Sequence, residues 1–395
     1  MSVPKLRFKE FDEDWTLTTL NQLSTKIGDG IHATPKYDES GTIPFINGNN
    51  LVNGRIAINE NTKRISSEEF QKYNQILSDR TLFLSINGTI GNLAFYKNEK
   101  VLLGKSVCFI NLKNDLDKKF IYLLLQSPQL TKTLNSELTG TTIKNLSLAT
   151  VRNLEFYCPI EAEQTKIASF LSAVDEKISQ LTKKHELLSQ YKQGMMQKLF
   201  SQQLRFKADD GSEFREWEEK ELKDIAEINP KSKKLPESFI YIDLESVEKG
   251  QLLLQKNIEL QDAPSRAQRL LAKGDVLFQM VRPYQQNNYY FNLSGEYVAS
   301  TGYAQIRTKL DSKFIYYALH EKTFLDEVMN RCTGTSYPAI NSSDLSSIEI
   351  LIPCLEEQTK IANFLSAIDQ KIEVVAQQIE QAKTWKKGLL QQMFI

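Results

Sequence analysis

The stretch EQTKIASFLSAVDEKI at residues 163–178 decides the organisation of this chain, because it recurs almost unchanged as EQTKIANFLSAIDQKI at residues 357–372. The two copies begin 194 residues apart, counted from 163 to 357, in a chain of 395 residues. The same interval joins Pro159 to Pro353. Self-similarity at one long, fixed interval is the signature of a duplicated structural unit. The sequence therefore predicts two copies of one unit, arranged one after the other.

Each copy opens with a weaker echo and continues with a divergent segment. The letters LRFK at residues 6–9 return at residues 204–207. Residues 25–118 and 227–312, in contrast, share little beyond scattered positions. Two nearly identical tails indicate one shared mechanical role, and two divergent heads indicate two different targets.

The repeated tails carry apolar residues at alternating steps of four and three. This spacing is the a/d pattern of a coiled coil and continues for about four heptads. Pro159 and Pro353 stand just before the tails, where they block backward extension of a helix. We expect two helices of roughly 37 residues, each about 55 Å long, that pair antiparallel as a spacer. The predicted seam consists of Ile167, Leu171, Val174, Ile178, Leu181, Leu188, Ile361, Leu365, Ile368, Ile372, Val375 and Ile379.

The heads contain short apolar runs bounded by Gly, Asn and Asp, which are typical of β-strands. The expected fold class is therefore α+β, with two mixed, mainly β domains joined by two long antiparallel helices in a coiled-coil spacer. Strands are expected over residues 81–86, 107–112, 239–244 and 275–281, and helices over residues 67–72, 120–134 and 314–329. The expected domains are residues 1–158 (first recognition domain), 159–203 (first spacer helix), 204–352 (second recognition domain) and 353–395 (second spacer helix).

Composition narrows the class of protein. Lys and Arg number 49, as do Asp and Glu, and this balance argues against a freestanding, non-specific nucleic-acid binder. The four cysteines form no C-x-x-C pair and there are only three histidines, so we expect no metal site. No apolar run approaches the ~20 residues of a membrane span, and the N-terminus lacks an apolar signal core. We expect a cytoplasmic protein that does not contact membranes.

Motifs of enzymes that act on DNA are missing from the sequence. It contains neither the [N/D]-P-P-[F/Y] motif of adenine methyltransferases nor the Walker A pattern of ATP-driven motors. Residues 218–220 (EEK) match the E-x-K pattern of nucleases only at a chance level. We therefore predict no catalytic residue in this chain.

Basic and amide side chains alternate with aromatic ones in several predicted loops. Residues 282–287 (RPYQQN) follow a predicted strand and are the best base-reading candidate of the second head, with an ordinary solvated loop as the alternative. Arginine pairs bidentately with guanine, and Asn or Gln with adenine, in the major groove. The candidate DNA-binding residues are Lys36, Tyr37, Asn87, Thr89, Lys105, Thr141, Thr142 and Lys144 in the first head, and Lys231, Lys233, Arg282, Tyr284, Gln285, Gln286, Asn287, Thr335, Ser336 and Tyr337 in the second.

Over nearly its whole length the chain resembles the specificity (S) subunits of type I restriction–modification enzymes. The features that carry the resemblance are DGIHATPKY at residues 29–37, TGTT at 139–142, and the duplicated PIEAEQTKI and PCLEEQTKI that introduce the heptads. The second copy has TGTS at residues 333–336 but lacks a TPKY-like opening, with NPKS at 229–232 instead. Contacts inferred for the first head therefore do not transfer directly to the second.

The resemblance implies a non-catalytic subunit whose two target-recognition domains each read half of a bipartite, asymmetric site on double-stranded DNA. It implies two methyltransferase (M) subunits and motor–nuclease (R) subunits as partners. S-adenosylmethionine, ATP and Mg²⁺ would belong to those partners, with no cofactor in this chain. Recognition elements on one DNA face lie roughly 34–36 Å apart, so we expect a non-specific gap of about 5–8 bp.

Two alternatives remain open on the sequence. One is a coiled-coil scaffold whose heads bind protein, and the genes next to this one would discriminate it. The other is the DNA-reading portion of a fused restriction–methylation enzyme, against which the missing catalytic motifs argue.

Overall fold

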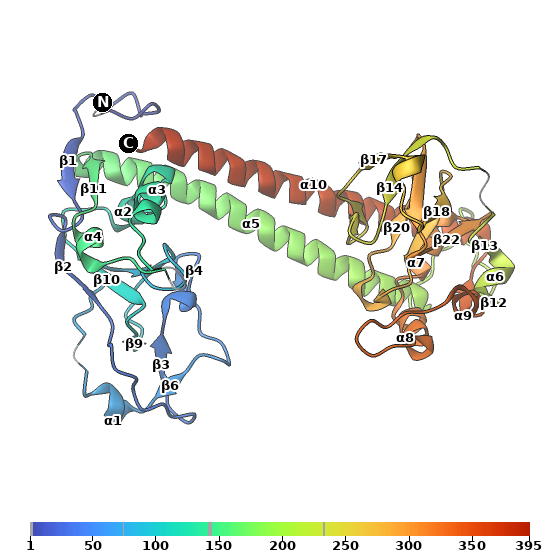
Figure 1. Cartoon of the computed structure of the whole chain (residues 1–395), viewed down its shortest axis with the longest axis horizontal. Helices are drawn as coiled ribbons and strands as arrows, with labels where there is room; N and C mark the ends of the chain where they lie inside the picture. The colour runs from blue at the N-terminus through green and yellow to red at the C-terminus, as the bar shows by residue number, and fades with distance from the viewer. Residues whose placement is uncertain (1–2, 74, 141–143, 232–233) are drawn as a thin grey trace. The chain divides into compact units, whose positions relative to one another are not determined.

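The computed structural model describes residues 3–73, 75–140, 144–231 and 234–395, and it divides into two compact units (Figure 1). Unit 1 comprises residues 1–182 and 377–395, and unit 2 comprises residues 183–376. Both long helices, α5 (Glu161–Phe200) and α10 (Leu355–Met393), contribute residues to both units. The predicted α+β class is confirmed, whereas the predicted domain limits stay a prediction because the two units divide both helices.

Unit 1 is built on a four-stranded sheet in the order β2 (Ser24–Asp29), β10 (Val107–Leu112), β7 (Thr81–Ser85), β8 (Leu93–Phe95). Strand β10 is antiparallel to both of its neighbours. Every residue of β7 and β10 is buried, which explains their continuous apolar sequences. The remaining elements of unit 1 are β1 (Thr16–Thr19), β3 (Ile43–Ile46), η1 (Gly48–Asn50), β4 (Leu51–Val52), β5 (Arg55–Ile56), β6 (Arg64–Ile65), α1 (Ser67–Phe70), β9 (Leu102–Leu103), α2 (Lys118–Leu124), α3 (Pro128–Ser136), α4 (Leu148–Arg152) and β11 (Glu155–Cys158).

Unit 2 repeats this plan with a sheet in the order β13 (Ala226–Ile228), β22 (Tyr303–Thr308), β19 (Val276–Gln279), β20 (Tyr289–Tyr290). Unit 2 also contains a second four-stranded sheet, in the order β17 (Lys256–Glu259), β14 (Ser238–Ile242), β21 (Tyr297–Ser300), β18 (Ala267–Leu270). The remaining elements of unit 2 are β12 (Glu218–Glu221), α6 (Leu222–Ile225), β15 (Val247–Glu248), β16 (Gln251–Leu252), η2 (Leu260–Asp262), η3 (Pro283–Gln285), α7 (Ser312–Ala318), α8 (Lys322–Arg331), α9 (Ser342–Ser346) and β23 (Glu349–Ile352).

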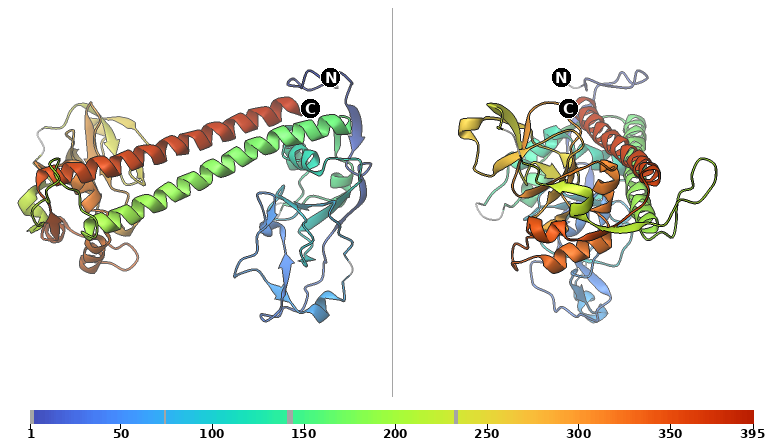
Figure 2. Two further views of the ribbon diagram at one scale, coloured as in Figure 1. Left: turned by 180° about the vertical axis from the view of Figure 1, so that it is seen from behind. Right: turned by 90° about the vertical axis from the view of Figure 1, so that its right-hand side faces the viewer.

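The two long helices run antiparallel within each unit. In unit 1 the beginning of α5 lies beside the end of α10 (Figure 2). There the Phe170 ring packs on the Trp385 ring, with centroids 6.1 Å apart. The Lys386 ammonium is 2.6 Å from an Asp175 carboxylate oxygen there. In unit 2 the end of α5 lies beside the beginning of α10, and the corresponding Lys192–Asp369 pair is also 2.6 Å long. Lysines at heptad positions are thus neutralised by an aspartate of the facing helix.

The predicted seam residues of α5 and α10 are mostly removed from solvent. Nine of the twelve are buried, and three are partly buried, because the a/d positions of each helix face apolar partners. The three partly buried ones are Ile178, Leu188 and Ile372.

Two predicted single helices are each broken in two. Residues 120–134 form α2 and α3, because the Ser127 hydroxyl accepts from the Leu130 amide and Pro128 begins a new helix. Residues 314–329 form α7 and α8, because the Glu321 carboxylate caps the second helix. The predicted strands are confirmed as β7, β10, β14 and β19, and residues 67–72 contain α1.

The aromatic rings of Phe170 and Phe364, near the beginnings of α5 and α10, are covered by the chain itself. Phe8 packs edge-on against Phe170 at 5.8 Å, and Phe206 packs against Phe364 at 5.7 Å. The segment that opens each copy therefore covers the first turns of its own long helix. In the part of the chain that the structure describes, no helix is long and apolar enough to cross a membrane.

Candidate nucleic-acid interface

Three of the candidate loops of unit 1 meet beside the end of β7. The Asn87 amide donates to the Asn145 side-chain oxygen at 3.2 Å, and the Gly88 amide donates to the Lys144 carbonyl at 3.1 Å. The Ile86 amide donates to the carbonyl of Ser106, the residue after Lys105, at 2.9 Å. The exposed candidates Thr89, Lys105 and Lys144 are thus carried by loops that hydrogen bonds tie together.

Lys36 and Tyr37 are held in a different part of unit 1, beside β6 and α1. The Tyr37 ring packs on Phe45 at 5.8 Å, and its backbone forms a bridge with Ile65. The Lys36 amide donates to the Glu69 carboxylate at 3.2 Å. Both side chains are exposed on this opening segment.

In unit 2 the corresponding loops are joined by the same backbone pattern. The Arg282 amide donates to the Pro338 carbonyl at 2.7 Å, and the Ile340 amide donates to the Met280 carbonyl at 3.1 Å. Val281 and Thr333 each form a bridge with Ala339, as Asn87 and Thr139 do with Asn145 in unit 1. The duplicated fold therefore presents the same pair of loops twice, with different side chains.

Hydrogen bonds already engage most amide side chains of the RPYQQN loop. The Gln279 amide group donates to the Gln285 side-chain oxygen at 2.9 Å, and the Lys249 backbone amide donates to the Asn287 side-chain oxygen at 3.0 Å. The Gln286 amide group donates to the His320 carbonyl at 3.4 Å. These hydrogen bonds hold the loop in its conformation. Arg282 and the exposed Tyr284 are the members of the loop best placed for an external ligand.

The other candidates of the second head have varied surroundings. Thr335, Ser336 and Tyr337 are exposed on the loop that faces Arg282, and Lys231 is exposed next to the end of β13. The Arg282 guanidinium carbon lies 4.1 Å from the centroid of the Tyr337 ring. Thr141, Thr142 and Lys233 lie outside the described residues. Many of the candidates predicted from the sequence lie on this pair of loops in each unit, and their contact with DNA stays a prediction. The sequence could not show which side chains the loops use internally.

One residue cluster in each copy escaped the sequence reasoning. The fully buried Glu163 carboxylate accepts from the Arg7 guanidinium at 2.7 and 2.8 Å and from the Trp15 indole at 3.2 Å. The hydrogen bond to Glu163 raises the pKa of Arg7 above its usual value. Every member of the cluster is duplicated in the sequence, and this duplication is the signal that could have revealed it. The matching cluster of unit 2 is Arg205, Trp217 and Glu357.

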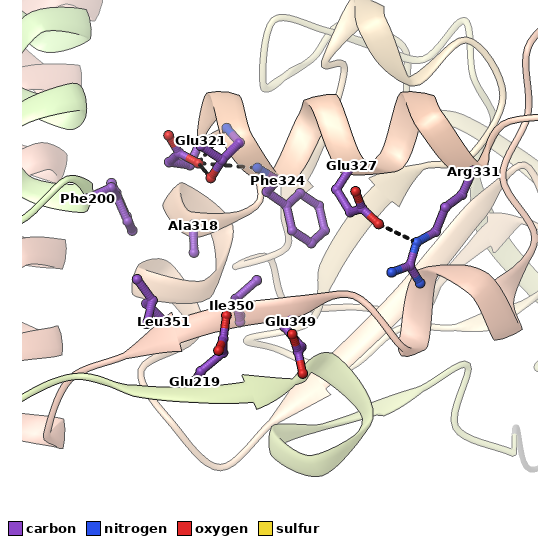
Figure 3. Close-up of a pocket in the computed structure, with 11 residues that line it drawn as sticks. Phe200, Glu219, Ala318, Glu321, Phe324, Glu327, Arg331, Glu349, Ile350 and Leu351 are labelled. Atoms are coloured by element: carbon purple, nitrogen blue, oxygen red, sulfur yellow. Dashed lines mark hydrogen bonds and ion pairs between the residues drawn. The ribbon is translucent and has the colours of Figure 1, made fainter.

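A cavity of about 270 Å³ in unit 2 is lined by several carboxylates, which makes it unsuited to bind DNA (Figure 3). Its lining includes Glu219, Glu321, Glu327 and Glu349, which would repel phosphates. Glu327 is tied to Arg331 at 2.8 Å, and the Glu321 carboxylate accepts from the backbone amide at the start of α8. None of the predicted DNA-binding residues lines this cavity. Its carboxylates therefore belong to the framework of unit 2.

Two observations describe side chains that could bind a metal ion or act as nucleophiles. No cluster of three or more His, Cys, Asp or Glu suited to a metal ion occurs among the described residues. Burial raises the pKa of the Cys158 thiol to about 12 and that of Cys108 still further, so both remain protonated and unreactive.

Comparison with known proteins agrees with this arrangement. The chain matches the family described as "Type I restriction modification DNA specificity domain" twice, over residues 12–189 and 215–384. It is 25% identical over 400 residues to "Type I restriction enzyme MjaVIII specificity subunit" of Methanocaldococcus jannaschii, an alignment that covers 96% of this chain and 91% of that relative.

Two solved structures share the fold. "Crystal structure of Type-I restriction-modification system S subunit from M. genitalium" has a TM-score of 0.61 at 20% identity and covers 100% of this chain and 99% of that one. "Structural basis underlying complex assembly and conformational transition of the type I R-M system" describes a chain with a TM-score of 0.55 at 16% identity, covering 95% of this chain and 96% of that one. The chain therefore belongs to the family of type I restriction–modification DNA specificity domains, and it carries two of them.

Proposed function

We propose that this chain is the DNA-specificity subunit of a type I restriction–modification enzyme and binds a bipartite, asymmetric site on double-stranded DNA. One observation carries the proposal within the family assignment. The same pair of loops occurs once in each unit, built on matching backbone bonds. One loop of the pair keeps TGT in both copies (139–141 and 333–335), whereas the other differs throughout, with NGTIGN at residues 87–92 and VRPYQQ at 281–286. Recognition of two different half-sites requires the same backbone framework with different base-contacting side chains.

The loops that differ also have the chemistry of base recognition. Unit 1 presents an amide, a hydroxyl and lysines, whereas unit 2 presents an arginine and two exposed tyrosines. Amide and guanidinium groups read base edges, and lysines contact phosphates. The near-zero net charge fits a subunit that binds DNA together with partners rather than alone.

In this proposal the long helices separate the recognition domains and form the platform for partner subunits. Two methyltransferase subunits would use this platform, since it is present twice, and motor–nuclease subunits would join them. S-adenosylmethionine, ATP and Mg²⁺ would be bound by those partners, while this chain would be non-catalytic. The complex would act in the cytoplasm, where the DNA is.

The proposal is tested by expressing the chain together with the methyltransferase encoded beside its gene and mapping methylated adenines across the host genome. The expected result is methylation at one motif of two short blocks separated by a fixed gap, and none when this chain is omitted. Methylation that persists without the chain, or a continuous palindromic motif, would contradict the proposal. Heads that bind only protein, the scaffold alternative, would give no chain-dependent motif.

A further inference from the structure

Position 282 of unit 2 and position 88 of unit 1 occupy the same place in the duplicated fold. They are 194 residues apart, and each donates its amide to the carbonyl of an equivalent residue, Pro338 or Lys144. Both have a left-handed backbone, with φ of 54° at Arg282 and 74° at Gly88. Glycine adopts this conformation freely, whereas a side chain strains it. Unit 2 therefore holds an arginine where the backbone favours glycine, and the arginine side chain must contribute something that offsets the strain.

The Arg282 side chain makes few contacts that could stabilise unit 2. Its guanidinium stacks on Tyr337, with 4.1 Å from the guanidinium carbon to the ring centroid, and its Nε is buried without a hydrogen-bond partner. Among the described residues, no carboxylate forms an ion pair with it. Arg205 and Arg307 of the same unit are ion-paired, with Glu357 and Asp275, whereas Arg269 shares with Arg282 a buried Nε without a partner. Arg282 is thus a positioned but uncompensated cation.

The stack on Tyr337 determines what such a cation can recognise. An aromatic face restricts the plane of the guanidinium and leaves its edge of N–H donors free to form two parallel hydrogen bonds. Two acceptors side by side, O6 and N7, are what guanine presents in the major groove. Tyr337 is 63% exposed, so the pair stands at the surface of the loop rather than inside the unit. A simple phosphate contact would need neither the stack nor the strained backbone.

We propose that Arg282, held against Tyr337, reads a guanine in the half-site bound by unit 2. This inference rests on the proposed function and assigns one base of one half-site to one side chain. The half-site of unit 1 has no equivalent contact, because glycine stands at position 88.

The test uses the full chain in complex with its methyltransferase subunits and a library of double-stranded DNA with randomised sequence. Sequences bound by the wild-type complex and by variant complexes are sequenced and compared position by position. Arg282→Gly restores the residue of unit 1 and relieves the backbone strain, Arg282→Lys keeps the charge without the planar fork, and Tyr337→Phe keeps the stack.

For Arg282→Gly and Arg282→Lys we expect the preference for guanine at one position of one block to fall by roughly 10- to 100-fold. Preferences at the other positions of that block and in the whole second block should not change. Tyr337→Phe should select the wild-type motif, whereas Tyr337→Ser should weaken the same guanine preference because the guanidinium is no longer held.

Three results would overturn the assignment. A loss of affinity that is uniform across all sequences would make Arg282 a phosphate contact, an unchanged motif would make it irrelevant to recognition, and a change in both blocks would place it outside one half-site. Thermal unfolding should show Arg282→Gly to be at least as stable as the wild type, and if it does not fold, the lysine and serine variants decide the matter. A wild-type complex that selects no motif at all would instead refute the proposed function, and this inference with it.

Discussion

His320 is a histidine that the fold keeps neutral. Its Nδ1 donates to the Tyr316 carbonyl at 2.7 Å, and its ring lies edge-on to the Tyr316 ring, with centroids 4.5 Å apart. Burial, together with the charge of Lys192, lowers the pKa of His320 to about 4. In the unfolded chain the pKa is about 6.5. The folded state therefore binds fewer protons than the unfolded state between pH 6.5 and pH 4, and stability must fall as the pH falls through this window.

The equivalent position of unit 1 supplies the residue for a control variant. Gln126 occupies the equivalent position in unit 1 and donates to the Tyr122 carbonyl at 3.0 Å, just as His320 donates to Tyr316. We predict that the free energy of unfolding of the wild type falls by about 2 kcal/mol more than that of His320→Gln when the pH is lowered from 7.5 to 5. Urea unfolding at both pH values measures this difference. Identical pH dependence of the two proteins would show that His320 is not kept neutral.

Glu163 is a second residue whose environment makes a prediction. Its carboxylate is fully buried and paired with Arg7, so replacement by alanine leaves a largely buried guanidinium without its carboxylate partner. We predict that Glu163→Ala lowers the free energy of unfolding by about 3–5 kcal/mol, measured by urea denaturation. Glu161→Ala, at an exposed position of the same first helical turn, should cost less than about 1 kcal/mol. Equal effects of the two variants would mean that the helix dipole, rather than the buried pair, is the important interaction.

At the scale of elements, the duplicated glycines of the two long helices are unexplained by contacts within the chain. A Cβ atom placed on Gly194 or Gly388 would meet no heavy atom within 4 Å. We predict that Gly194→Ala and Gly388→Ala each stabilise the isolated chain by up to ~1 kcal/mol, the usual gain of alanine over glycine in a helix. Thermal unfolding tests this, and a lower melting temperature would reveal a contact that the structure lacks. Weaker methyltransferase binding by the more stable variants would locate a close approach of a partner at these sites.

Sequence reasoning succeeded best for elements with a long and regular pattern. The heptads of residues 163–178 and 357–372 predicted α5 and α10, and continuous apolar runs predicted β7 and β10. It was wrong where a single residue overrides the pattern, since Ser127 and Pro128 divide one amphipathic stretch into two helices. Apolar periodicity carries no information about a cap, so a break of this kind has to be recognised from local chemistry.

The sequence located the candidate loops but not the state of their side chains. The segments near Asn87 and Arg282 follow predicted strands, where irregular, exposed backbone collects, and their role in binding DNA stays a prediction. The internal use of Gln285 and Asn287 depends on Gln279 and Lys249, which come from other parts of unit 2. Contacts between such distant residues are set by tertiary structure, so no local pattern could show which amides remain available for DNA.

At the scale of the whole molecule, the duplication separates what is constant from what varies. Matching features recur at an interval of about 194 residues: the buried clusters around Glu163 and Glu357, the lysine–aspartate pairs between helices, and the bridged loops. On the bridged loops only part of the sequence recurs: TGT at residues 139–141 returns at 333–335, whereas NGTIGN at residues 87–92 is replaced by VRPYQQ at 281–286. The contacts that stabilise each unit are thus encoded twice in the same way, whereas one of the two loops differs between the units.

The measurement that tests this account most directly is methylation mapping with one head exchanged. Residues 205–350 are replaced by the matching segment of another family member, and methylated adenines are mapped in cells that also express the methyltransferase. The account predicts that one block of the two-block motif changes, while the other block, which unit 1 reads, is retained. A motif that changes in both blocks, or methylation that does not depend on this chain at all, would contradict it.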